Sequence, residues 1–300
     1  MQKSVVILGA GISGLMAAHD LRRHGFQVTV LDKGNRAGGR LATRPFEGAI
    51  FDYGAQYFTV RHERFASYQR AWETKGIIRL WDRDRYIGQA GMNSIATHLC
   101  QGLDLRCGTK VRQIFESAGV WNLETDFDEV LHADAVISTC PVPQTLAMLD
   151  RKLPELEAIT YDRCLALMAI LSEAPDLPEP GYKQIDDGGP VTWIADNRRK
   201  GISPSSHNLT IHASAQFSLN HWERNAEDIA PMLLNGYQAT AWKLHRWKYA
   251  KPTVQHNTSF YEVDSKKPLL LAGDAFGGAR VEGAALSGLF AAERLRELLS

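Results

Sequence analysis

The sequence predicts an α/β fold with two sheets, a parallel sheet assembled from both ends of the chain and a mainly antiparallel sheet inserted between them. Short aliphatic runs at 5–8 and 269–272 are typical of strands buried on both faces of a parallel sheet. From about 150 to 250 such runs shorten and tryptophans concentrate. We therefore expect a discontinuous first domain from 1–52, 89–149 and 251–300, and a second domain from 53–88 and 150–250.

Composition excludes several classes of protein. The 300 residues are 44% hydrophobic and 23% charged, which is a globular composition. Basic and acidic residues number 34 each, so no net charge favours nucleic acid or an anionic membrane as partner. The four cysteines and ten histidines show no zinc-ligand spacing, and we expect no metal. The apolar start is too short for a signal peptide or membrane span, which favours the cytoplasm.

The first forty residues form a βαβ pattern around a GxGxxG motif. Gly9 permits a tight turn, Gly11 lets a diphosphate approach the backbone, and Gly14 allows the helix to pack closely on the strand. Asp32 follows at the end of the second strand, where a carboxylate accepts hydrogen bonds from ribose hydroxyls. The sequence therefore predicts a Rossmann-like FAD/NAD(P)-binding domain. Further candidate contacts in this unit are Ser13 and Lys33.

A second glycine-rich segment, AGGRLATR at 37–44, follows the second strand. Gly39 leaves the backbone unobstructed, and the Arg40 guanidinium can contact a phosphate. The alternative is a flexible loop with a solvated arginine.

The GxGxxG motif, the acid and the GGR triplet together resemble the N-terminus of the FAD-dependent amine oxidase superfamily. Longer motifs resemble its renalase family, in the bacterial form, and occur in that family's order nearly from end to end. Segments 60–90, 150–190 and 198–207 carry little of the resemblance. The motifs are DYGAQYFT (52–59), WIADN (193–197), HASAQFS (212–218), HRWKYA (245–250) and AGDAFGGARVEGAALSG (272–288).

The resemblance implies an FAD-dependent oxidoreductase with non-covalent FAD. Its substrates would be dihydro isomers of NAD(P), the 1,2- or 1,6-dihydro forms, which pass hydride to flavin N5. Oxygen would then reoxidise the flavin and give H2O2. The expected partners are thus a small-molecule substrate and O2, with no nucleic acid or membrane, in a monomer or homodimer. Oxidation of a small amine and non-catalytic flavin binding stay open as alternatives.

Hydride transfer needs no nucleophile, metal or strong acid, so we predict no catalytic side chain and an aromatic pocket. In HRWKYA, aromatic and cationic residues alternate as on a strand with two different faces. Each aromatic residue could instead belong to the core. The candidates for the pocket are Tyr57, Trp193, His245 and Trp247, with Phe58 beside Tyr57.

The remaining candidate FAD contacts rest mostly on the resemblance. Asp274 ends a predicted strand and would contact the ribityl or diphosphate part, and Val111 would hold the adenine through its backbone. The helix that begins near Val281 should direct its N-terminus toward the flavin. Gln56 could hydrogen-bond the flavin ring or only stabilise a turn. The other candidates are Ala55, Gly273 and Glu282.

Overall fold

The computed structural model describes residues 2–300 and contains the two expected sheets. The first is parallel except for its edge strand β17, and its order is β17-β18-β11-β1-β2-β7. Strands from both ends of the chain lie next to one another because β11 pairs with both β1 and β18. Its strands are β1 (Ser4–Leu8), β2 (Gln27–Asp32), β7 (Asp104–Cys107), β11 (Ala135–Ser138), β17 (Tyr261–Glu262) and β18 (Leu269–Leu271).

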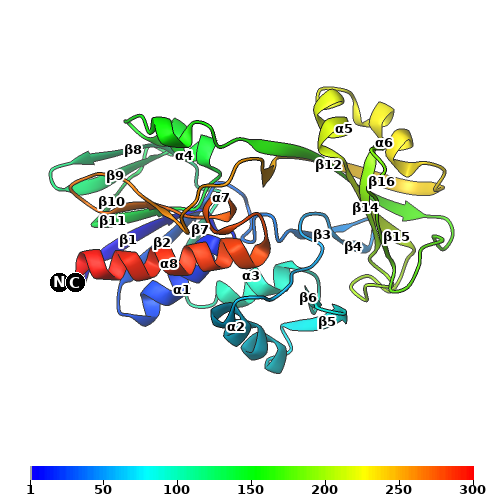
Figure 1. The fold of residues 1–300 in the computed structure, drawn as a ribbon, viewed down its shortest axis with the longest axis horizontal. Helices are drawn as coiled ribbons and strands as arrows, with labels where there is room; N and C mark the ends of the chain where they lie inside the picture. Colours follow the sequence, from blue (N-terminus) through cyan, green and yellow to red (C-terminus); the bar gives the residue numbers. More distant parts are fainter. Residues whose placement is uncertain (1) are drawn as a thin grey trace.

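Helices α1 (Ile12–Arg23) and α8 (Val281–Leu299) cover one face of this sheet and lie against each other (Figure 1). Gly288 makes their close approach possible, because a Cβ atom there would lie 2.0 Å from the Ser13 carbonyl oxygen. The opposite face is covered by a smaller antiparallel sheet and short helices. These are β8 (Val111–Ser117), β9 (Val120–Thr125), β10 (Val130–Ala133), α4 (Val142–Met148) and the 3-10 turn Pro154–Leu156.

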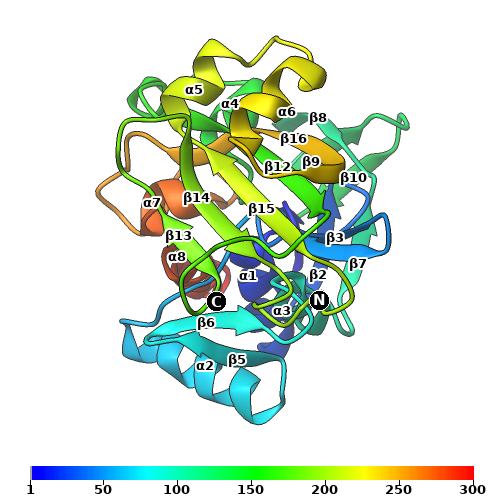
Figure 2. The same ribbon diagram turned by 90° about the vertical axis from the view of Figure 1, so that its right-hand side faces the viewer.

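The second sheet is antiparallel and has the order β13-β14-β15-β12-β16 (Figure 2). Alternate residues of β12, such as Leu165 and Leu167, pack under a helical layer. The sequence of the inserted region predicts one helix, near 223–240. The chain forms two, because Ser214 caps an additional helix by accepting a hydrogen bond from Phe217 N. The elements are β12 (Tyr161–Leu171), β13 (Tyr182–Gln184), β14 (Val191–Asp196), β15 (Asn208–Ala213), β16 (Ala239–Pro252), α5 (Ala215–Asn220) and α6 (Ala226–Leu234).

The segment between the sheets contains two hairpins and two helices. Phe51 on the first hairpin packs against Met168 of the second sheet. In contrast, Phe65, Trp72 and Ile87 share a core with α1 and α8, so segment 63–88 packs with the first sheet. The division of the chain into domains stays a prediction. The elements are β3 (Thr43–Phe46), β4 (Ala49–Asp52), α2 (Glu63–Thr74), β5 (Ile78–Asp82), β6 (Arg85–Gly88) and α3 (Asn93–Leu99). Elsewhere, the single turn α7 (Asp274–Gly277) follows β18 of the first sheet.

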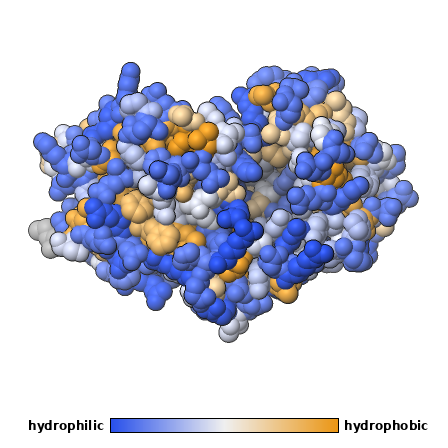
Figure 3. Space-filling model, viewed as in Figure 1, coloured by the Kyte–Doolittle hydropathy of each residue, from blue (hydrophilic) through white to orange (hydrophobic). Residues whose placement is uncertain are grey.

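The outer surface is mostly hydrophilic, and it is hollowed between the two halves of the molecule (Figure 3). Among residues 2–300, no helix has the length and apolar character needed to cross a membrane. The same residues contain no cluster of three or more His, Cys, Asp or Glu side chains suited to a metal ion.

Candidate active site

The glycine turn after β1 has the geometry that a diphosphate needs. Gly9 adopts φ +99°, and a Cβ atom at Gly14 would lie 1.9 Å from the Gly9 carbonyl oxygen, so both positions require glycine. A Cβ atom at Gly11 would meet no protein atom within 4 Å and would project into open space beside the cavity described below. Gly39 lies against this turn, because a Cβ atom there would be 3.4 Å from the Gly11 Cα.

Asp32 holds the turn against the second strand. Its two carboxylate oxygens accept hydrogen bonds from Ala10 N and Gly34 N, each at 2.7 Å. Each oxygen keeps a further lone pair for a ribose hydroxyl. The neighbouring candidate Lys33 is exposed, and Val111 is buried at the start of β8. Their predicted contacts with a cofactor stay predictions.

Arg40 and Asp274 form a two-pronged ion pair that joins the second glycine loop to the C-terminal part of the chain. Arg40 Nη2 donates to Asp274 Oδ1 at 2.8 Å, Nη1 donates to Oδ2, and Nη1 also lies 3.2 Å from the Ala250 carbonyl oxygen. Burial lowers the pKa of Arg40, but the charge and hydrogen bond of Asp274 outweigh it and raise the pKa overall. Sequence reasoning gave these residues separate contacts and missed that they pair.

A cavity of about 460 Å³ lies where these elements meet the second sheet. This size is within the range of small-molecule sites. Its wall includes nine of the predicted site residues together with Phe58. The nine are Gly11, Ser13, Arg40, Ala55, Tyr57, Trp247, Gly273, Asp274 and Val281. The others lie behind this wall or away from it: Gly9, Gly14, Asp32, Lys33, Gly39, Gln56, Val111, Trp193, His245 and Glu282.

The start of α8 contributes to the cavity through Val281 and Ala284, and its predicted contact with a flavin stays a prediction. Glu282 is turned inward and is 4% exposed. Its Oε1 accepts hydrogen bonds from Arg61 N at 2.7 Å and His62 N at 2.8 Å. Glu282 therefore attaches the loop that follows Tyr57 to the N-terminal turn of α8.

One face of the second sheet forms the opposite wall. Cys164, His212 and Trp247 come from the neighbouring strands β12, β15 and β16, and all three line the cavity. Cys164 is paired with Trp247, and His212 is paired with Ala166, two residues further along the same strand face. The strand prediction for HRWKYA is confirmed, and Arg246 points away from the cavity to the Trp222 and Arg224 carbonyl oxygens.

Tyr53 organises this wall. Its ring lies 5.3 Å from the Trp247 ring and 4.9 Å from the His245 ring. Its carbonyl oxygen accepts a hydrogen bond from Trp247 Nε1 at 2.8 Å and lies 3.2 Å from His212 Nε2. Burial lowers the pKa of both His212 and His245 to about 4. Both imidazoles are therefore neutral at physiological pH.

Trp193 lies in a second layer of aromatic rings behind the cavity. It is 8% exposed, stacks on Tyr182 at 4.8 Å between ring centroids, and lies 5.5 Å from Tyr57. The Arg85 guanidinium packs on the faces of the Tyr57 and Tyr182 rings. This layer fixes the position of Tyr57, which lines the cavity.

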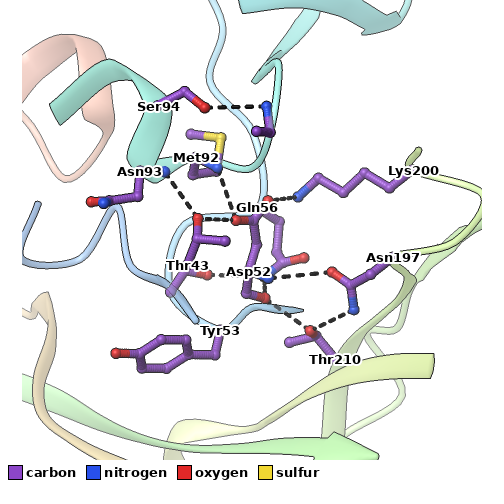
Figure 4. A network of polar contacts seen from close by, with 12 residues as sticks. Thr43, Asp52, Tyr53, Gln56, Met92, Asn93, Ser94, Asn197, Lys200 and Thr210 are labelled. Atoms are coloured by element: carbon purple, nitrogen blue, oxygen red, sulfur yellow. Dashed lines mark hydrogen bonds and ion pairs between the residues drawn. The ribbon is translucent and has the colours of Figure 1, made fainter. Parts of the chain in front are cut away.

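A buried polar network around Asp52 holds Tyr53 in place (Figure 4). Asp52 Oδ1 accepts from Thr43 Oγ1 and Met92 N, and Oδ2 accepts from Lys200 Nζ. The Asp52 carbonyl oxygen accepts from Thr210 Oγ1 at 2.8 Å and from Gln56 Nε2 at 2.6 Å. Gln56 thus supports the chain turn through its amide nitrogen, and its Oε1 is buried without a partner among residues 2–300.

Several of these residues were missed by sequence reasoning. Asp52 and His212 lie in motifs that carry the family resemblance, but nothing in the sequence pattern distinguishes them from ordinary strand residues. Lys200 lies in the run RRK, which has the pattern of a solvated surface segment, although its side chain is fully buried. Burial of a lysine next to an aspartate is visible only in the folded chain.

The fold and the cavity define a class of protein, the dinucleotide-binding flavoproteins. The open space at Gly11, the helix N-terminus and the Arg40 side chain fit a diphosphate-containing cofactor such as FAD. The model for NAD(P)-binding Rossmann-like domains matches residues 7–72, and the model for flavin containing amine oxidoreductases matches residues 71–296. The chain therefore belongs to the flavin containing amine oxidoreductase family.

The chain is also similar to individual proteins, over different shares of its length. The chain is 23% identical to renalase of Mus musculus over 329 residues, which cover 95% of this chain and 96% of that protein. Mitochondrial protoporphyrinogen oxidase of Nicotiana tabacum is 46% identical over 57 residues, 19% of this chain and 11% of that protein. The expected renalase-like FAD-dependent oxidoreductase of the amine oxidase superfamily is confirmed.

A solved structure supports the fold itself. The putative protoporphyrinogen oxidase from Exiguobacterium sp. 255-15 superimposes with a TM-score of 0.81 over the whole of both chains at 16% identity. The expected fold class, a Rossmann-like domain with an inserted antiparallel sheet, is confirmed.

Proposed function

We propose that this protein is an FAD oxidase of dihydro isomers of NAD(P), the 1,2- or 1,6-dihydro forms. The observation that carries the proposal is the cavity itself, which lies between the glycine turn and the second sheet and has Tyr57, Phe58 and Trp247 in its wall. Similarity to renalase over 95% of the chain supports the same substrate class.

Bound FAD would supply the redox chemistry, taking one hydride at N5 and leaving NAD(P)+. The two electrons and the proton of that hydride, together with one proton from solvent, would then pass to O2 and give H2O2. The protein's task is then to orient the dihydropyridine ring. The rings of Tyr57 and Trp247 offer flat apolar surface for this purpose, and their supporting layers keep them rigid.

Cations at the cavity wall support a substrate with phosphate groups. Arg61 and Arg280 both line the cavity, and neither forms an ion pair with a carboxylate within residues 2–300. Guanidinium groups pair well with phosphate oxygens. We assign these two residues to the diphosphate of the dinucleotide substrate.

We also propose that FAD is bound non-covalently. Cys164 is the cysteine on the cavity wall, and burial raises the pKa of its thiol to about 12. A thiol that stays protonated is a poor nucleophile. Acid precipitation tests this point, because non-covalent flavin is released into the supernatant, whereas a covalent adduct remains with the protein.

Anaerobic flavin bleaching tests the substrate. The oxidised protein is mixed separately with isomerised NADH and with a panel of small amines, and flavin absorbance is followed. We expect rapid bleaching by the isomers and stoichiometric H2O2 once air is admitted. Bleaching by an amine and none by the isomers would assign the protein to amine oxidation. Bleaching by neither would favour a flavin-binding protein without turnover.

A further inference from the structure

Two ring nitrogens of the cavity wall lie within hydrogen-bond distance of the Tyr53 carbonyl oxygen. Trp247 Nε1 lies 2.8 Å away and His212 Nε2 lies 3.2 Å away. A carbonyl oxygen can only accept hydrogen bonds, so the His212 nitrogen that faces it must carry a proton. The position of that proton is thus determined by the main chain of the preceding hairpin.

The other ring nitrogen of His212 must then be an acceptor. A neutral imidazole has one N–H donor and one lone-pair acceptor, and burial keeps His212 neutral by lowering its pKa to about 4. Within residues 2–300, His212 Nδ1 makes no hydrogen bond. The side-chain atoms that are fully buried without a partner do not include it. His212 lines the cavity, so a ligand there can contact its ring.

The neighbouring polar groups of this wall are already engaged. The Trp247 N–H is held by Tyr53, and the Cys164 Sγ contacts the carbonyl oxygens of Leu165 and Ala213 at 3.7 Å. Of the Cys164, His212 and Trp247 side chains, His212 is therefore the one with a nitrogen acceptor that no group of residues 2–300 uses. A ligand that uses it must bring a hydrogen-bond donor to the ring-binding part of the cavity.

We propose that His212 is a specificity residue that accepts a hydrogen bond from the carboxamide NH2 of the dihydronicotinamide ring. This inference rests on the proposed function. In a dihydronicotinamide dinucleotide the ring nitrogen carries the ribose and has no hydrogen, so the carboxamide supplies the only N–H donors of that ring. Holding this group would fix which ring carbon faces the flavin.

Substrate analogues test the inference. The probes are isomerised NADH and the isomerised, reduced 3-acetylpyridine analogue, in which a methyl group replaces the amide NH2. The ratio of their bimolecular rate constants for anaerobic flavin bleaching is measured in each protein. Because the intrinsic reactivity of the two rings is common to all proteins, a change in the ratio reports the contact with the side chain.

Two nearly isosteric variants provide the comparison. His212→Leu has neither donor nor acceptor, and His212→Asn can donate to Tyr53 and still present an acceptor to the cavity. We expect the preference for the carboxamide to fall about tenfold or more in His212→Leu and to be partly kept in His212→Asn. The control is His132→Phe, which changes an exposed histidine on β10 and should leave the ratio unchanged.

Flavin content and circular dichroism are measured for each variant, and His212→Phe replaces His212→Leu if the latter does not retain flavin. If the wild-type protein oxidises both probes and the ratio is unchanged in the variant without an acceptor, the proposed role of His212 is wrong. If neither probe bleaches the wild-type flavin, the proposed function is wrong, and the inference falls with it.

Discussion

The Nζ atom of Lys200 donates to Oδ2 of Asp52 at 2.6 Å, and neither side chain is exposed to solvent. Asp52 ends β4, and Lys200 follows β14 of the second sheet, so the pair joins the central hairpin to that sheet (Figure 4). The next residue after Asp52 is Tyr53, whose carbonyl oxygen orients His212 and Trp247. The ion pair therefore supports the cavity wall from behind.

Removal of the lysine should be strongly destabilising. We expect Lys200→Ala to lower the free energy of unfolding by about 3–5 kcal/mol, because Asp52 would remain buried without its counter-charge. Urea unfolding of the flavin-free protein measures the change. The control is Arg70→Ala, which breaks an exposed ion pair with Glu63 and should cost about 1 kcal/mol or less. A similar loss in both variants would contradict the supporting role of the buried pair.

Two glycines of the same turn should respond differently to alanine. Gly11→Ala places a methyl group in open space beside the cavity, so the flavin-free protein should keep its stability and lose affinity for FAD. Gly14→Ala places a methyl group 1.9 Å from the Gly9 carbonyl oxygen and should destabilise the fold itself. Flavin-to-protein ratios and unfolding of the flavin-free proteins separate the two effects. Tight FAD binding by Gly11→Ala would show that this space does not hold the diphosphate.

Arg40 and Asp274 should act as a unit in retaining FAD. Each alone, Arg40→Ala and Asp274→Ala, should weaken FAD binding, since each change leaves the other charge without its partner. The double variant should lose much less than the sum of the two single losses. Titration of the flavin-free proteins with FAD gives the coupling. Additive losses would mean that the two side chains contact the cofactor independently.

Stability should fall in mild acid. The pKa of His212 is lowered to about 4 in the native protein, whereas an unfolded histidine has a pKa of about 6.5. Between these values the unfolded chain binds the additional proton, so the free energy of unfolding decreases as pH falls, by up to about 1.4 kcal/mol per pH unit for this residue. His245 adds to the effect in the same direction.

Urea unfolding of the flavin-free protein between about pH 7 and pH 5 measures this slope. In His212→Leu the slope should be smaller, because one of the groups that titrate only after unfolding is absent. An identical slope in the variant and the wild type would show that His212 is protonated in the native state.

Much of the fold could be predicted because its signals are local. The βαβ unit around Gly9, Gly11 and Gly14 follows from strand composition, helical spacing and turn chemistry, and it corresponds to β1, α1 and β2. The second helix over the inserted sheet was missed, since its signal is a single capping serine, Ser214. The assignment of 53–88 to the second domain stays a prediction. The apolar residues of 63–88 share a core with α8, a contact that amphipathic patterns do not specify.

The sequence by itself determined the cofactor-binding turn and the class of protein, because close packing at Gly14 and open backbone at Gly11 require glycine in any chain that folds this way. The tertiary structure decided which side chains meet. Only folding pairs Arg40 with Asp274, 234 residues apart, and Lys200 with Asp52, 148 residues apart. The partner of a charged side chain, and the proton that His212 carries, depend on contacts between distant segments that no local pattern encodes.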